Sequence, residues 1–153
     1  VFEAARHRLE APSPRVALGL ALRGIATSAI DVSDGLLGDL GHVLKQSGVG
    51  ATVETGVAMN LIASHADYSR GKARFSTQIT SDQWLGWALA GGDDYELLFT
   101  APPSAREAVA VAAQSSQTPV TRVGSINAEL GLRLVDCHGK RVDNTFRSFD
   151  HFA

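Results

Sequence analysis

Apolar side chains three and four positions apart predict several helices along this chain. The pattern is most regular over residues 35–47, where Leu36, Leu40 and Leu44 recur on one face and Gly48 follows as a terminator. A second helix is expected over residues 15–22, with Ser13 as N-cap, Pro14 at the first position and Gly24 after its end. Two more are expected, one that begins at Ser81 or Asp82 and ends at Ala90, and one that follows Pro102-Pro103-Ser104 and ends near residue 115.

Short apolar runs that alternate with polar residues, or that lie between turn residues, predict strands. Residues 95–100 (Tyr-Glu-Leu-Leu-Phe-Thr) are expected to form a buried strand. The other strands are expected at residues 27–31, 50–55, 120–126 and 132–136, with a His138-Gly139 hairpin turn leading to Val142. Several neighbours are joined too tightly for parallel crossovers. We therefore expect an α+β fold, with a mixed or antiparallel sheet covered by helices.

The composition narrows the class of protein. The 153 residues are 44% hydrophobic, which is enough for a single domain over residues 1–153. A net charge of −2 argues against a nucleic-acid binder, which needs a basic face. No apolar run is long enough to cross a membrane, and the first residues lack a signal-peptide pattern. The single cysteine, Cys137, excludes an intramolecular disulfide or a cysteine-based zinc site and fits a reducing cytoplasm.

Acidic residues gather at two junctions between predicted elements. The first, Asp31-Val32-Ser33-Asp34-Gly35 (the Asp31 cluster), ends a strand and begins a helix. Its carboxylates suit Mg²⁺, which takes one or two of them together with substrate phosphates, and a helix start offers amides to phosphate oxygens. The alternative is helix capping by Ser33 or Asp34, which leaves Asp31 unexplained. Spacing alone does not decide between the two.

The second junction, Gly91-Gly92-Asp93-Asp94-Tyr95-Glu96 (the Asp93 cluster), follows a helix and opens a strand. Neighbouring side chains on a strand point to opposite faces, so Asp93 and Asp94 are not expected to bind one ligand as a pair. The alternative is a glycine C-cap and a solvated turn, with Glu96 as an edge charge or the partner of an arginine. The sequence has no Walker loop, so metal ions and backbone amides must bind any phosphate here.

At these two clusters the chain resembles the thiamine-monophosphate kinase family. The Asp31 cluster, followed by Asp39-Leu40-Gly41-His42, is similar to the family's signature. Three more segments agree in order: Pro12-Ser13-Pro14-Arg15, the Asp93 cluster with Leu97, and Asp150-His151-Phe152. The resemblance runs from about residue 6 to the C-terminus. It implies the fold of the C-terminal domain of aminoimidazole ribonucleotide synthetase-like enzymes.

The resemblance also implies that the γ-phosphoryl group of ATP is transferred to thiamine monophosphate, giving thiamine diphosphate. By motif, Asp31 and Asp34 look like Mg²⁺ ligands and Ser33 looks like a contact to the nucleotide phosphates. Asp93 matches a substrate-binding position that can be the longer Glu in the family. Phe149 matches an aromatic position that packs on the substrate's ring, where Tyr or Trp is common. Because the acceptor is already a phosphate, no protein nucleophile is expected.

Members of that family also carry an N-terminal domain, with a Gly-Asp-Asp metal motif and most of the nucleotide contacts, that forms a homodimer. None of its motifs occurs here, and the chain begins at Val1 without a methionine. We therefore expect the C-terminal half of a two-domain kinase, inactive by itself. Two rivals remain: a related enzyme such as aminoimidazole ribonucleotide cyclo-ligase, and a non-catalytic regulatory domain.

Overall fold

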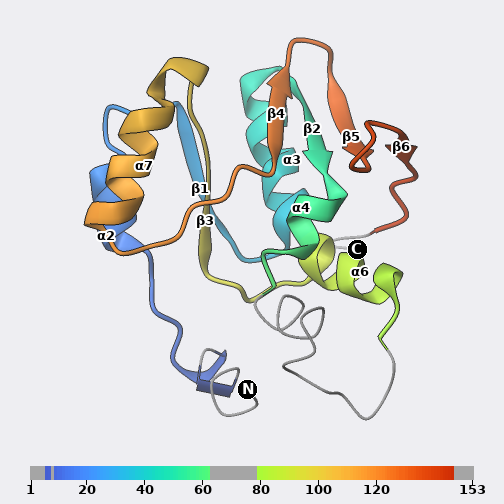
Figure 1. Cartoon of the computed structure of the whole chain (residues 1–153), viewed down its shortest axis with the longest axis horizontal. Coiled ribbons are helices and arrows are strands. Elements are labelled where there is room, and N and C mark those ends of the chain that lie inside the picture. The colour runs from blue at the N-terminus through green and yellow to red at the C-terminus, as the bar shows by residue number, and fades with distance from the viewer. Residues whose placement is uncertain (1–5, 8, 63–78, 147–153) are drawn as a thin grey trace.

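The computed structural model describes residues 6–7, 9–62 and 79–146, which form two sheets and the helices around them (Figure 1). The first sheet is an antiparallel ribbon of two strands, β1 (Ser28–Val32) and β3 (Glu96–Thr100). Two helices that contact each other lie on one side of this ribbon, α2 (Val16–Ala21) and α7 (Arg106–Ser115). The 3₁₀ turn η1 (Pro103–Ala105) leads from the ribbon into α7.

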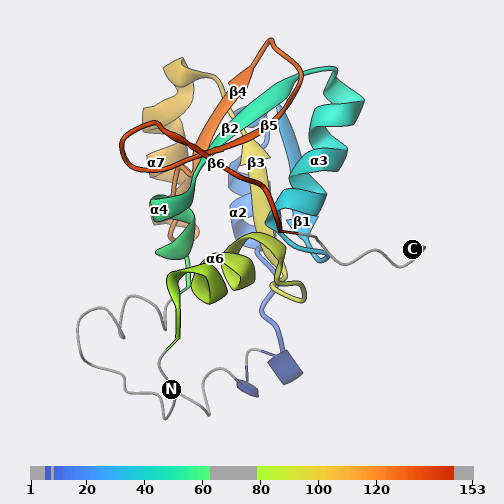
Figure 2. The ribbon, with the colours of Figure 1, turned by 90° about the vertical axis from the view of Figure 1, so that its right-hand side faces the viewer.

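The second sheet has four strands in the order β4-β2-β5-β6 (Figure 2). Their bounds are β2 (Gly50–Glu54), β4 (Gly124–Asn127), β5 (Gly131–Val135) and β6 (Arg141–Val142). The β2–β5 pair is parallel, and the β2–β4 and β5–β6 pairs are antiparallel. The sheet is therefore mixed, and the predicted α+β class is confirmed, although the strands divide into two sheets where one was expected.

Helix α3 (Leu36–Ser47) joins the two sheets into one structure. Its apolar face packs in a single cluster with Val32 of β1, Val53 of β2 and Leu134 of β5. Leu36, Leu40 and Leu44 are each no more than 6% exposed, and burial of such side chains stabilises a fold by roughly 1.5–3 kcal/mol each. Helices α4 (Thr55–Met59) and α6 (Ser81–Ala90) contact each other and close one end of this core.

The helix predicted over residues 35–47 is confirmed, with its first residue at Leu36 and Gly48 as a left-handed C-cap at φ 64°. The N-caps of two other helices differ from the prediction. Helix α2 has Arg15 and not Ser13 as its N-cap, and α6 has Thr80 and not Ser81 or Asp82. At Thr80 the hydroxyl accepts from the Gln83 amide while the Gln83 side chain accepts from the Thr80 amide, and this reciprocal pair fixes the helix start.

Strand β3 was expected to be buried, but all five of its residues are only half-buried. Its two faces pack against different clusters. Leu97 and Phe99 contact the α2–α7 side, and Leu98 contacts the core of α3. Among the described residues, no further strand pairs with the outer edges of this two-stranded ribbon, which explains the partial exposure. Within the described residues, no helix is long and apolar enough to cross a membrane.

Candidate functional site

The antiparallel register of the ribbon brings the two acidic clusters to the same end of the structure. Val32, near the end of β1, pairs with Glu96, the first residue of β3. The Asp31 cluster consists of the last two residues of β1 and the loop after them, and the Asp93 cluster ends at the first residue of β3. Segments about sixty residues apart in sequence are thus neighbours because of strand pairing. No local sequence pattern predicted this contact.

Two backbone hydrogen bonds tie the clusters together. The Asp93 amide donates to the Ser33 carbonyl at 2.9 Å, and the Tyr95 amide donates to the Val32 carbonyl at 3.0 Å. Gly92 permits this approach, since a Cβ atom there would lie 2.6 Å from the Ser33 carbonyl oxygen. Gly35 has a φ of +104°, and a Cβ atom there would lie 3.0 Å from the backbone of Ala90. Gly92 therefore permits the close contact between the loops, and Gly35 permits the close approach to the end of α6.

A buried carboxylate, Asp39, holds the Asp31 cluster from the helix side. One oxygen, Oδ2, accepts from the Ser33 amide at 2.9 Å and from the Asp34 amide at 3.2 Å. Asp39 is 3% exposed and lies in the first turn of α3. No role was predicted for Asp39 from the sequence. The available signal was an acid three residues after Leu36, at a position that belongs to the apolar face of the helix.

These hydrogen bonds change which groups at the start of α3 are available to a ligand. The N-cap of α3 is Gly35, so neither Ser33 nor Asp34 takes the capping position proposed as the alternative. The amides of Ser33 and Asp34 are bound to Asp39. These two amides are therefore not the phosphate donors suggested for this junction. What the cluster offers to a ligand is side-chain oxygen, which suits a metal ion.

Residues 91–95 of the Asp93 cluster form a loop, and β3 begins only at Glu96. Asp93 and Tyr95 have φ values of 61° and 52°, which are rare for residues other than glycine. The strand alternation expected to separate Asp93 from Asp94 therefore does not apply. The Tyr95 hydroxyl donates to Asp93 Oδ1 at 3.2 Å, and this bond, with the carboxylate charge, raises the pKa of Tyr95 above its ordinary value. The Asp93 carboxylate thus has a hydrogen-bond partner within its own loop.

A groove of about 350 Å³ lies beside the β1–β3 ribbon. Asp31, which is exposed, lines it together with Tyr95 and an ion pair between Arg15 and Glu96. Arg15 Nε and Nη2 each donate to a Glu96 carboxylate oxygen at 2.8 Å, which confirms the arginine-partner interpretation of Glu96. The pKa of Arg15 is raised by this hydrogen-bonded pairing. Asp34 is half-buried and is not among the described residues that line this groove.

The carboxylates at this site suit Mg²⁺ better than a metal ion whose ligands all come from the protein. Within the part of the chain that the structure describes, no group of three or more His, Cys, Asp or Glu residues is placed to hold a metal ion. Mg²⁺ usually takes one or two carboxylates and completes its six ligands with waters and substrate phosphates. Asp31 and Asp34 could supply those carboxylates, while Asp39 is buried and bound to amides.

The remaining predicted site residue, Phe149, lies outside the described residues.

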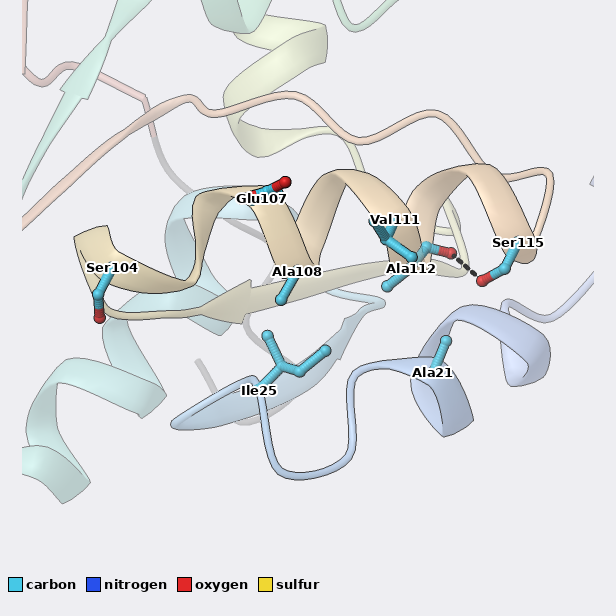
Figure 3. Close-up of a pocket in the computed structure, with 8 residues that line it drawn as sticks. All are labelled: Ala21, Ile25, Ser104, Glu107, Ala108, Val111, Ala112 and Ser115. Carbon is cyan, nitrogen blue, oxygen red and sulfur yellow. Dashed lines mark hydrogen bonds between the residues drawn. The ribbon is translucent and has the colours of Figure 1, made fainter.

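A second hollow, of about 680 Å³, lies between α2 and α7 (Figure 3). Ala21 and Ile25 face α7 across it, and the lining on α7 includes Ala108, Val111 and Ala112. Neither acidic cluster contributes a side chain to this hollow, so the candidate site is at the joined clusters.

Comparisons with known proteins identify relatives of the chain. No protein-family model matches the chain. The thiamine-monophosphate kinase of Salmonella typhimurium is 41% identical over 143 residues, which are 93% of this chain and 40% of that protein. The Haemophilus influenzae enzyme of the same name is 42% identical over 149 residues, covering 92% of the chain and 40% of the enzyme.

A solved structure of a thiamine-monophosphate kinase also matches this chain. The crystal structure of thiamine-monophosphate kinase from Stenotrophomonas maltophilia matches with a TM-score of 0.70 and 39% identity, covering 87% of this chain and 39% of that one. The chain thus spans about 40% of the length of the curated relatives it matches. Over nearly its whole length, this chain is homologous to the thiamine-monophosphate kinases.

Proposed function

We propose that this chain is the C-terminal domain of a thiamine-monophosphate kinase. The complete enzyme would use ATP and Mg²⁺ to phosphorylate thiamine monophosphate to thiamine diphosphate. One observation supports this most strongly: the Asp31 and Asp93 clusters, which carry the family's motifs, are hydrogen-bonded to each other through Asp93 and Ser33. Homology at 41% identity over 93% of the chain supports the same assignment.

In this proposal, Asp31 and Asp34 bind Mg²⁺ and the Ser33 hydroxyl contacts the nucleotide phosphates. Bound Mg²⁺ supplies positive charge that offsets the charge of the crowded phosphate oxygens. The acceptor is a phosphate, so the protein need not provide a nucleophile, and its residues act by aligning donor and acceptor. The exposed position of Asp31 on a groove supports this role, because a ligand can reach its carboxylate.

Asp93 and Phe149 bind the thiamine monophosphate. Two contacts support the role of Asp93: its carboxylate accepts a hydrogen bond from the Tyr95 hydroxyl, and its backbone amide donates to the Ser33 carbonyl. Aspartate is one bond shorter than the glutamate found in some relatives, so we expect the substrate to lie closer to this loop. Phe149 would stack on a ring of the substrate without donating a hydrogen bond.

Residues 1–153 form one domain in this proposal, and the rest of the enzyme is an N-terminal domain that carries most of the ATP contacts and forms a homodimer. The enzyme acts in the cytoplasm, where the single cysteine would stay reduced. The chain alone is expected to bind ATP weakly and to have no kinase activity, because its carboxylates supply only part of a metal shell.

The proposal is tested by measuring thiamine diphosphate formation with the two-domain protein and with this chain alone. We expect product from the two-domain protein, given ATP, Mg²⁺ and thiamine monophosphate, and none from the chain alone. A ribonucleotide amidine in place of thiamine monophosphate separates the rival cyclo-ligase. Turnover of the amidine alone, turnover of neither acceptor, or full activity of the isolated chain would each contradict the corresponding part of the proposal.

A further inference from the structure

The loop between β1 and α3 is held from both sides by hydrogen bonds of its backbone. On one side, the carbonyl of Ser33 accepts from the Asp93 amide. On the other side, the amides of Ser33 and Asp34 donate to a single oxygen of Asp39. Asp39 therefore contacts the backbone of Ser33 and Asp34, two of the three residues proposed to bind metal and nucleotide, although Asp39 itself is buried and cannot reach a ligand.

We infer that Asp39 is a positioning residue for the kinase reaction, an inference that rests on the proposed function. Its carboxylate fixes the peptide planes of Ser33 and Asp34, and these planes determine where their side chains point. Hydrogen bonds from backbone amides to a carboxylate are short and strong compared with those between neutral groups. Partners outside a metal's own ligand shell commonly set the orientation of the ligands.

The position of Asp39 in the fold explains why no other described contact takes over its hydrogen bonds to the Ser33 and Asp34 amides. Gly35 interrupts regular structure between β1 and α3 with a φ of 104°, so neither a strand ladder nor a helix ladder fixes the amides of Ser33 and Asp34. Asp39 lies one turn into α3, and its own amide donates to the Gly35 carbonyl at 3.1 Å. The loop thus folds back over the first turn of the helix, which brings both amides to the carboxylate.

Two variants separate the effect of the Asp39 acceptor oxygen from the effect of its charge. Asp39→Ala removes the acceptor, and Asp39→Asn keeps an oxygen of similar position without the charge. Leu40→Val is the matched control, since Leu40 is the next residue of α3 and 4% exposed but contributes no hydrogen bond to the loop. It lowers stability through loss of one buried methylene without removing the acceptor.

The first measurement is amide hydrogen exchange of this chain, followed by NMR. We expect the Ser33 and Asp34 amides to exchange at least about tenfold faster in Asp39→Ala than in the parent, since each loses its acceptor. Asp39→Asn should lie between them, and Leu40→Val should not single out these two amides. Unchanged exchange of Ser33 and Asp34 in Asp39→Ala would overturn the positioning role, whatever the enzyme does.

The second measurement is the Mg²⁺ dependence of the two-domain kinase. In Asp39→Ala we expect the Mg²⁺ concentration for half-maximal turnover to rise about tenfold, and kcat to fall by about tenfold to 100-fold. A merely structural loss would lower the active fraction without moving the Mg²⁺ midpoint, as expected for Leu40→Val. Faster exchange with an unchanged midpoint and kcat would overturn the inference. A parent enzyme without kinase activity would instead refute the proposed function, and with it the catalytic part of this inference.

Discussion

At the residue scale, contacts with backbone atoms decide which side chains the two clusters can carry. Gly92 lies where a Cβ atom would be 2.6 Å from the Ser33 carbonyl oxygen. We expect Gly92→Ala to destabilise the fold by about 1–3 kcal/mol, because backbone must move to relieve the overlap. Denaturant unfolding measures the change.

Gly41 provides the control for this prediction. It lies within α3, and a Cβ atom there would meet nothing within 4 Å. Gly41→Ala should therefore stabilise the fold by about 0.5–1 kcal/mol through helix propensity. Equal free energies of unfolding for the two alanine variants would show that the loop contact does not constrain Gly92.

Asp136 gives the protein a pH dependence at the turn between β5 and β6. Its Oδ1 accepts from the amides of His138 and Lys140, each at 2.9 Å, and these bonds lower the pKa of Asp136 below its usual 3.8. A lowered pKa in the folded state stabilises the fold above the unfolded value of 3.8, and this contribution disappears as the pH falls through the folded value.

We therefore expect Asp136→Ala to be less stable than the parent near neutral pH, and the difference to shrink as the pH drops below 3.8. Urea unfolding of both proteins at several pH values measures it. Asp143→Ala, a change of an exposed aspartate after β6, is the control. A difference between Asp136→Ala and the parent that is constant with pH would contradict the assignment to the carboxylate.

At the element scale, the start of α6 tests whether the reciprocal Thr80–Gln83 pair is the true cap. Thr80→Ala removes the hydroxyl that accepts from the Gln83 amide, and loss of such a cap typically costs about 1 kcal/mol. Ser81→Ala, at the residue that the sequence favoured, should change stability by less than about 0.5 kcal/mol. A larger loss in Ser81→Ala than in Thr80→Ala, measured by thermal unfolding, would contradict the observed cap.

Elements with strong local signals could be predicted from the sequence, and long-range pairings could not. Helix α3 was predicted within one residue because its leucine spacing and Gly48 are both local. The pairing of β1 with β3 joins Ser28 to Thr100, and no periodicity carries that information. The half-burial of β3 and the division into two sheets were missed for the same reason.

The candidate site, like the helices and strands, combines local signals that the sequence carries with long-range contacts that it does not. Motif residues indicated Asp31, Ser33, Asp34 and Asp93 as candidates. The contact between Ser33 and Asp93 depends on the strand register, and the Asp39 hydrogen bonds depend on how the loop turns back over α3. The capping interpretation failed because Gly35, with its positive φ, occupies the N-cap position. Residue types and motifs thus suggested the candidate residues, and their arrangement in space required the fold.

At the scale of the whole molecule, the proposed function makes this chain one side of a site. It spans about 40% of the kinases that it matches, and its proposed metal carboxylates are not joined by a third acidic or imidazole ligand among the described residues. An exposed Asp31 on an open groove is what a domain would present if phosphates and a second domain completed the shell. The central claim is therefore that Asp31 and Asp34 bind the catalytic magnesium.

The most direct test is the turnover of the two-domain enzyme carrying Asp31→Asn or Asp34→Asn, with Asp82→Asn, an exposed acid of α6, as control. Each variant keeps the size of the side chain and loses its charge. We predict that kcat falls about 100-fold or more in both, since a bound metal contributes several kcal/mol to the transition state. Melting temperatures and the turnover of Asp82→Asn should stay near the parent's. Parental turnover in both Asp31→Asn and Asp34→Asn would contradict the account.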